Sequence, residues 1–210
     1  MPDVLGVFVK APVAGRVKTR LAADVGSRRA AGLYRGMGRA ILAGCVHPGA
    51  YRTVVWFSPP GAQRSVRTWL KGLRVSAFAP QGDGGLGVRL SVAFRRHFRE
   101  GARRVVVIGS DCPDVDRGSV TRAFAALDVC DVVIGPAGDG GFYLLGLRAP
   151  AAGLFRGVAW STDTVLDQTL ANAGRLGLEC SLLPTLRDVD TVSDARALGL
   201  LRMAASSWVT

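Results

Sequence analysis

The segment VLGVFVKAPVAGRVKTRL, residues 4–21, joins an apolar run to a basic loop. Its first six residues are mostly apolar, with β-branched and aromatic side chains, which is typical of a buried strand. The loop that follows holds Lys10 and Lys18, two of only three lysines in a chain whose other basic residues are arginines. We therefore expect a strand that ends in a loop suited to bind an anion.

Five further apolar runs alternate with segments that have helical spacing. The predicted strands are residues 4–9, 53–58, 74–79, 104–110, 131–136 and 142–147, and the predicted helices are residues 27–45, 61–71, 88–100, 117–127, 163–174 and 191–205. This alternation predicts an α/β fold in which helices cover both faces of a mostly parallel sheet. Ligands of such sheets bind beyond the carboxyl ends of the strands, so the strand-end loops are the candidate sites.

The composition indicates one compact domain over residues 1–210, because 49% of the residues are hydrophobic and only 20% are charged. The segment MPDVLGVFVK lacks the basic region of a signal peptide and becomes polar too soon for a membrane span. We expect a cytoplasmic protein. The four cysteines are scattered singly, which argues against a zinc site or a disulfide framework. No oligomeric state follows from the sequence.

The net charge of +11 raises the question of nucleic-acid binding. The arginines are spread along the chain without a basic run longer than two residues, and aromatic residues are not interleaved with them as a stacking platform requires. We therefore expect a small anionic ligand and no nucleic acid.

Glycine-rich and acidic motifs follow the later predicted strands. In PQGDGGLGVRL, Gly82, Gly84 and Gly87 fit G-x-G-x-x-G, which leaves a dinucleotide site open as an alternative to a simple turn. In VVVIGSDCPD, Asp111 ends a strand, where a carboxylate commonly meets a ligand or a divalent cation. Asp114 and Asp116 are either part of that site or caps of the next helix.

Further aspartates lie in turns and before helices. Asp139, in GPAGDGGFYLLGL, either binds a hydroxyl group or cation or forms a hairpin turn. Asp163 precedes a predicted helix in WSTDTV, and Asp188 and Asp190 precede the last one in LRDVDTVSDA.

Taken in order, KAPVAGRVKTRL, QGDGGLGVRL, GSDCPD, GPAGDGGFYLLGL, VAWSTDTVL and LRDVDTVSDA resemble a bacterial family of GT-A-type proteins known as arsenosugar-biosynthesis or selenodomain-associated glycosyltransferases. The chain is also similar to the wider nucleotide-diphospho-sugar transferase superfamily, and KTRL is similar to phospholactate guanylyltransferases. The resemblance covers nearly the whole chain. It implies a GT-A (Rossmann-like) three-layer sandwich.

The resemblance also implies site residues. We expect nucleotide binding by Lys10, Pro12, Gly15, Arg16, Lys18, Arg20, Gln81, Gly84, Gly85 and Ser110. Asp111 and Asp190 match metal-binding aspartates for Mg²⁺ or Mn²⁺, although D-C-P replaces the family's D-x-D. The expected catalytic residues are Lys18 and Asp111, with Asp139 or Asp163 as the base.

The predicted function is transfer of a sugar from a nucleotide sugar to a small-molecule acceptor with help from a divalent metal. A nucleotidyltransferase that uses an NTP is the alternative, and a non-catalytic nucleotide-binding module is a second one. In the transferase readings, Asp111 and Asp190 should face one pocket beside the Lys18 loop.

Overall fold

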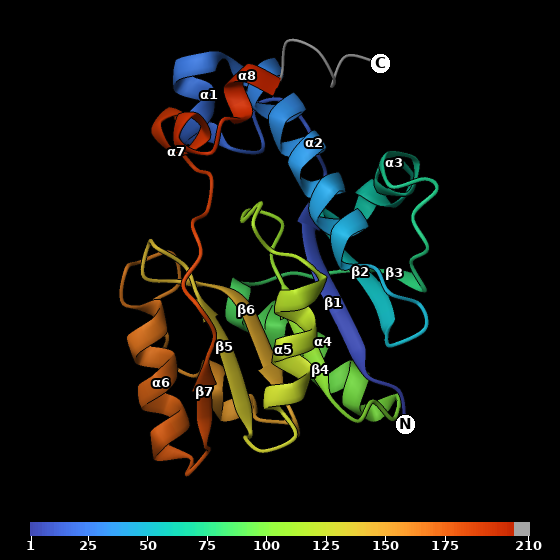
Figure 1. The fold of residues 1–210 in the computed structure, drawn as a ribbon, viewed down its shortest axis with the longest axis vertical. Helices are drawn as coiled ribbons and strands as arrows, with labels where there is room; N and C mark the ends of the chain where they lie inside the picture. Colours follow the sequence, from blue (N-terminus) through green and yellow to red (C-terminus); the bar gives the residue numbers. More distant parts are fainter. Residues whose placement is uncertain (204–210) are drawn as a thin grey trace.

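The computed structural model describes residues 1–203, and its centre is a seven-stranded sheet with the order β3-β2-β1-β4-β6-β5-β7 (Figure 1). β6 runs antiparallel to both of its neighbours, whereas the other strand pairs are parallel. The strands are β1 (Val4–Lys10), β2 (Arg52–Ser58), β3 (Ala77–Pro80), β4 (Val105–Ile108), β5 (Val132–Pro136), β6 (Phe142–Leu147) and β7 (Cys180–Leu182).

Helices cover both faces of this sheet. The α-helices are α1 (Thr19–Val25), α2 (Ser27–Cys45), α3 (Gln63–Trp69), α4 (Leu86–Arg99), α5 (Arg117–Ala126), α6 (Val165–Arg175), α7 (Val192–Ala197) and α8 (Leu200–Met203), and short 3₁₀ turns lie at η1 (Pro60–Ala62) and η2 (Ala152–Phe155). One apolar core joins the sheet to α2, α3 and α5, and a second joins it to α4, α6 and η2. The predicted α/β sandwich is confirmed.

Alternation along β1 explains the two cores. Leu5, Val7 and Val9 point into the core under α2, whereas Val4 and Phe8 point into the core under α4. This period of two is the pattern that a strand buried on both faces requires. It places β1 in the interior of the sheet, directly beside β2 and β4.

All six predicted strands are present, with bounds shifted by up to three residues. β7 and α1 were not predicted. The helix expected at residues 191–205 is two short helices, because Gly199 adopts a left-handed φ of 68° between α7 and α8. Residues 204 and 205 of that prediction lie outside the described residues. Asp116 proves to be the cap of α5, where its side chain accepts a hydrogen bond from the Ser119 N–H.

The carboxyl ends of β1, β2, β3 and β4 meet at one edge of the sheet. Figure 1 shows α1, α7 and α8 gathered beyond this edge, above the ends of the strands. The segment of residues 183–191, hereafter the strap, runs from β7 up to α7 and joins this group to the sheet. The loop that follows β1 and the end of β4 contact the strap just before α7.

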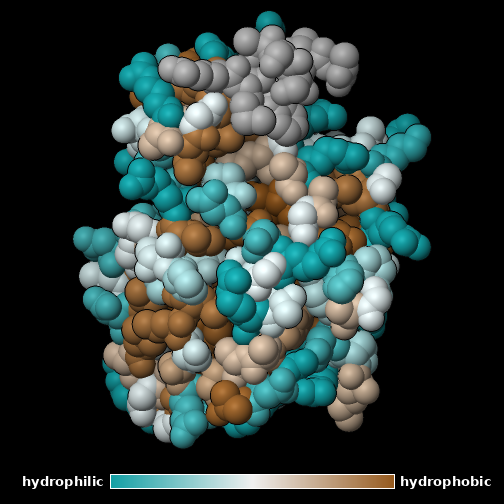
Figure 2. Space-filling view, in the orientation of Figure 1, coloured by the Kyte–Doolittle hydropathy of each residue, from teal (hydrophilic) through white to brown (hydrophobic). Residues whose placement is uncertain are grey.

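The surface in Figure 2 is hydrophilic over much of its area, with hydrophobic side chains gathered beside β7 and α6. β7 is an edge strand, and Leu182 on it is exposed. Among residues 1–203, no helix has both the length and the apolar character needed to cross a bilayer.

Candidate functional site

A pocket of about 600 Å³ opens at the carboxyl ends of β1 and β4. Its wall includes the loop after β1, the loop after β3, the end of β4 and the strap. Nine residues predicted from the sequence line it, namely Lys10, Lys18, Arg20, Gln81, Gly84, Gly85, Ser110, Asp111 and Asp190. The structure thus brings together residues that are separated by up to 180 positions in the sequence.

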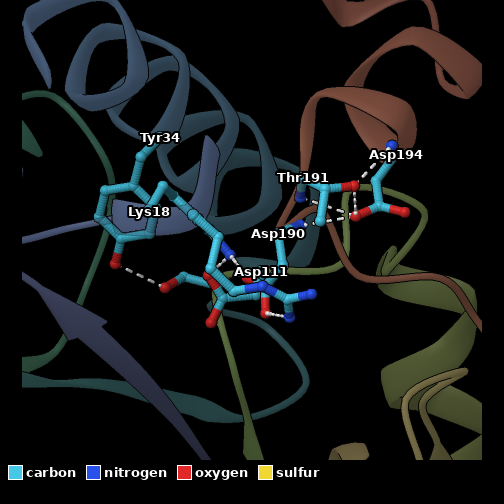
Figure 3. A network of polar contacts seen from close by, with 8 residues as sticks. Lys18, Tyr34, Asp111, Asp190, Thr191 and Asp194 are labelled. Atoms are coloured by element: carbon cyan, nitrogen blue, oxygen red, sulfur yellow. Dashed lines mark hydrogen bonds and ion pairs between the residues drawn. The ribbon is translucent and has the colours of Figure 1, made fainter. Parts of the chain in front are cut away.

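Lys18 lies between two carboxylates in this pocket (Figure 3). Its Nζ is 2.5 Å from Asp111 Oδ1 and 2.8 Å from Asp190 Oδ1, so these two oxygens lie within 5.3 Å of each other, the sum of the two distances. The backbone of Lys18 is left-handed, with φ 47° and ψ 49°, at the N-cap of α1. This uncommon conformation for a non-glycine residue accompanies the inward direction of the side chain, which is only 6% exposed.

The two aspartates hold Lys18 in its charged form. Burial alone would lower the pKa of Lys18, but the charges of Asp111 and Asp190 outweigh it and raise the pKa. The lysine is therefore an ammonium ion at neutral pH, with a hydrogen bond to Asp190 and an ion pair with Asp111. Its positive charge is offset by the two carboxylates that contact it, so a phosphate chain would bind here together with a divalent cation.

The strap places Asp190 against the end of β4. The Val189 N–H donates to the Asp111 carbonyl at 3.0 Å, and the Asp190 N–H donates to Asp194 Oδ2 at 3.1 Å. Thr191 and Asp194 form a capping box that starts α7 (Figure 3). The N–H groups of Val189 and Asp190 therefore fix this part of the strap, and the Asp190 carboxylate points to Lys18.

Tyr34 is a pocket residue that the sequence analysis missed. Its hydroxyl accepts a hydrogen bond from the Lys10 N–H at 2.9 Å and lies 2.8 Å from Ser110 Oγ, so it joins the end of β1 to the end of β4. Burial, followed by the negative charge of Asp111, raises the pKa of Tyr34 to about 12. Tyr34 looked like one more apolar position of the helix at 27–45, and its spacing carries no signal of a polar role.

The carboxylate pair fits the ligand needs of a divalent cation. Mg²⁺ commonly takes one or two protein carboxylates and completes its shell with phosphate and water. The Oδ1 atoms of Asp111 and Asp190 are close enough to share an ion, but the Lys18 ammonium lies between them in this structure, and Arg20 Nη1 lies 4.0 Å from Asp190 Oδ2. Among residues 1–203, no group of three or more acidic, histidine or cysteine side chains is arranged as a metal site, so phosphate would have to supply further ligands.

Five residues expected in the site do not line the pocket, namely Pro12, Gly15, Arg16, Asp139 and Asp163. The first three belong to the outer part of the loop after β1, where Gly15 and Arg16 are exposed. Asp139 folds back on its own turn, where its Oδ1 accepts from the Gly141 N–H at 2.9 Å. The Asp163 backbone packs against Gly140, where a Cβ would overlap the Asp163 carbonyl. The geometry therefore gives no support to Asp139 or Asp163 as the base.

The loop after β3 forms another wall. Gln81 is buried there, and its amide nitrogen donates to the backbone carbonyls of Val9 and Trp56. Its amide oxygen accepts from Arg89, which also donates to the Gly84 carbonyl. Arg89 lines the pocket and was missed, because it reads as an ordinary residue of the predicted helix at 88–100.

Gly87, the last glycine of the G-x-G-x-x-G match, has a packing role. A Cβ at this position would lie 2.6 Å from Trp160 Nε1, so only glycine allows the indole of Trp160 to lie against α4. The glycine motif also follows β3 and not the first strand, where a dinucleotide fingerprint belongs. The dinucleotide alternative is therefore not supported.

Comparison with known proteins gives one family match. The family described as "Uncharacterized protein conserved in bacteria (DUF2064)" matches residues 41–162. Among curated proteins, none matches the sequence.

Solved structures share the fold. A proposed nucleotide-diphospho-sugar transferase from Desulfovibrio desulfuricans is 36% identical, with 97% of this chain and 89% of that chain covered and a TM-score of 0.88. A nucleotidyl transferase from Methanothermobacter is 18% identical, with coverage of 96% and 98% and a TM-score of 0.59. Rv0371c from Mycobacterium tuberculosis, in complex with manganese, is 19% identical, with coverage of 94% and 98% and a TM-score of 0.52.

Proposed function

The chain belongs to the DUF2064 family of bacterial proteins, and from this premise we propose that it is a nucleotide-dependent transferase that acts at a nucleotide diphosphate. The observation that carries the proposal is the Lys18 ammonium between Asp111 and Asp190 in a pocket of about 600 Å³. A buried cation beside two carboxylates suits a phosphate chain with a divalent ion. The likeness to the Desulfovibrio protein supports a nucleotide sugar as the first candidate donor.

In glycosyl transfer, an acceptor atom bonds to the anomeric carbon while the bond from this carbon to the diphosphate oxygen breaks, and a proton on the acceptor atom passes to the leaving diphosphate or to water. The bonding electrons stay on the diphosphate, which leaves as part of the nucleoside diphosphate. The Lys18 ammonium and Arg20 would neutralise the charge that builds on that oxygen. Asp111 and Asp190 would hold Mg²⁺ or Mn²⁺, which supplies further positive charge to the diphosphate when bound.

Nucleotidyl transfer is the second candidate, and the placement of Asp139 and Asp163 favours it. Neither aspartate lines the pocket, so no carboxylate predicted as a base stands ready to deprotonate an acceptor hydroxyl. An acceptor that is already an anion, such as a phosphate, needs no such base to attack the α-phosphorus of an NTP. The bond to the β-phosphate oxygen then breaks and pyrophosphate leaves.

One assay distinguishes these reactions. The protein is incubated with Mn²⁺ and either nucleotide sugars plus acceptors or NTPs plus sugar phosphates, and nucleoside diphosphate and pyrophosphate are measured. We expect nucleoside diphosphate from the nucleotide sugars. Pyrophosphate from the NTPs would instead establish nucleotidyl transfer, and nucleotide binding without either product would support a non-catalytic module.

Two variants control for contaminating enzymes. Asp111→Asn removes one of the paired carboxylates and should abolish product formation. Arg95→Ala changes an exposed arginine of α4 outside the pocket and should leave product formation unchanged. Equal product from both variants would contradict the assignment of the pocket.

A further inference from the structure

We propose that Arg89 reads the base of the nucleotide and selects a base edge that carries two adjacent hydrogen-bond acceptors, as guanine and cytosine do. This inference deepens the proposed function and rests on the pocket being a nucleotide site. It concerns recognition alone, so it makes a prediction about binding that does not depend on which transfer reaction follows.

The guanidinium of Arg89 is fixed by neutral acceptors. Its Nε donates to the Gly84 carbonyl at 2.9 Å, and one terminal nitrogen donates to Gln81 Oε1 at 3.3 Å. Within residues 1–203, no carboxylate forms an ion pair with Arg89. An arginine side chain has five N–H donors, so three of them lack an acceptor in this part of the chain.

Gln81 determines where this guanidinium lies. Its amide nitrogen donates to the Val9 carbonyl at 3.1 Å and the Trp56 carbonyl at 2.9 Å. Both amide hydrogens are thereby used, and only the amide oxygen is left to accept from Arg89. Gln81, which we expected to bind the nucleotide, is therefore a positioning residue whose two amide hydrogens are already used.

The surroundings of Arg89 suit a base better than a phosphate. Phe8, Leu86 and Leu90 line the same pocket as the arginine, and Gly84 and Gly85 line it without side chains. An aromatic base presents flat apolar faces to such walls and a polar edge to a donor. A phosphate would accept from the same free N–H donors of Arg89, but its remaining oxygens would lose hydration against these apolar walls, which an aromatic face does not.

The order of strands separates this end of the pocket from the charged end. Lys18 contacts Asp111, which follows β4 on one side of β1, whereas Gln81 and Arg89 follow β3 on the other side, beyond β2. One nucleotide can span the two ends, with its phosphates at Lys18 and its base at Arg89.

The donor pattern predicts which bases bind. The arginine fork matches two neighbouring acceptors, such as N7 and O6 of guanine or N3 and O2 of cytosine. Adenine places its N6 amino donor beside N7, and uracil places the N3–H donor between its two carbonyls. A donor of the base would then face a donor of Arg89, so adenine and uracil should bind more weakly.

The test measures dissociation constants of GDP, CDP, ADP and UDP by calorimetry with Mn²⁺ present. For the unaltered protein, we expect GDP and CDP to bind roughly ten-fold or more tightly than ADP and UDP. 7-Deaza-GDP, which lacks the N7 acceptor, should bind roughly ten-fold more weakly than GDP. This comparison uses the unaltered protein alone, so its result does not depend on whether a variant folds.

Arg89→Lys keeps the positive charge but removes the two-donor fork of the guanidinium. It should reduce the affinity advantage of GDP and CDP, while the dissociation constants of ADP and UDP change by less than about three-fold. Arg95→Lys, on the same helix but outside the pocket, is the matched control and should bind as the unaltered protein does. Equal affinity for the four bases, or an equal loss for all four in Arg89→Lys, would overturn the proposal. A base preference without any transfer would refute the proposed reaction and leave this inference standing, whereas no binding of any nucleotide would refute both.

Discussion

Replacement of Lys18 by methionine isolates the charge that the two aspartates share. Methionine keeps much of the length and volume of the buried side chain but removes the ammonium, which contacts Asp111 at 2.5 Å and Asp190 at 2.8 Å. Two carboxylates then remain within 5.3 Å without a cation between them. Their repulsion should destabilise the folded protein and should also create a stronger site for a divalent ion.

The size of the repulsion follows from Coulomb's law. At a separation of 5.3 Å the energy is about 3 kcal/mol for an effective dielectric constant of 20 and about 0.8 kcal/mol for that of water. Because Asp111 is 51% and Asp190 39% exposed, solvent screens the pair and the true value lies between these limits. We expect Lys18→Met to lower the free energy of unfolding by roughly 1 to 3 kcal/mol.

Urea unfolding with and without MnCl₂, together with calorimetric titration of Mn²⁺, measures both effects. Mn²⁺ should stabilise Lys18→Met more than it stabilises the unaltered protein, because the ion replaces the missing charge. The affinity for nucleoside diphosphate without metal should fall roughly ten-fold or more, as expected for one lost charged hydrogen bond. Lys71→Met, which changes an exposed lysine outside the pocket, is the matched control. Unchanged stability together with unchanged Mn²⁺ affinity in Lys18→Met would refute the reasoning.

Two further predictions concern stability away from Lys18. Burial lowers the pKa of His97 to about 4 in the folded protein. Between pH 4 and 6.5 the unfolded state therefore binds more protons at this residue than the folded state does. The free energy of unfolding should rise with pH by up to about 3 kcal/mol over that range. His97→Gln keeps an acceptor for the Trp56 indole N–H, so it should flatten this rise of the free energy of unfolding with pH in urea unfolding. His47→Gln is the control and should not flatten it. The same pH dependence of stability in both variants would contradict the prediction. Gly140→Ala should destabilise the protein by more than Gly157→Ala, because both positions have a positive φ but only Gly140 lies against the Asp163 carbonyl. Gly157→Ala should lower the stability measured by thermal unfolding by about 1 kcal/mol. An equal loss of stability in Gly140→Ala would show that the contact with the Asp163 carbonyl is unimportant.

Much of the fold could be predicted because buried strands and long helices have strong periodic signals. β7 was missed because its three residues, Cys-Ser-Leu, are partly exposed and are held at the sheet edge by backbone pairing with β5. α1 was missed because its first three residues, Thr19–Leu21, lie inside the segment that we interpreted as an anion-binding loop. Neither element has an apolar face long enough to show a period.

The site could be predicted only in part, because strand ends identify loops but not the directions of side chains. The sequence placed Asp111, Asp190 and Lys18 at one sheet edge, yet we expected an ion between the aspartates where the structure has the lysine ammonium. That arrangement depends on the left-handed backbone of Lys18, which no neighbouring residue signals. Arg89 and Tyr34 were missed because their polar roles depend on contacts with distant segments.

The contact between Lys18 and Asp190 joins residues 172 positions apart, and this separation matters while the chain is being synthesised. At about 5 to 20 residues per second, Lys18 is made roughly 10 to 30 s before its second partner exists. During that interval a growing chain can pair β1 with β2, but it cannot hold the lysine between two carboxylates. A chain that stops before the strap would lack this arrangement, so tight nucleotide binding would distinguish complete molecules from shortened ones.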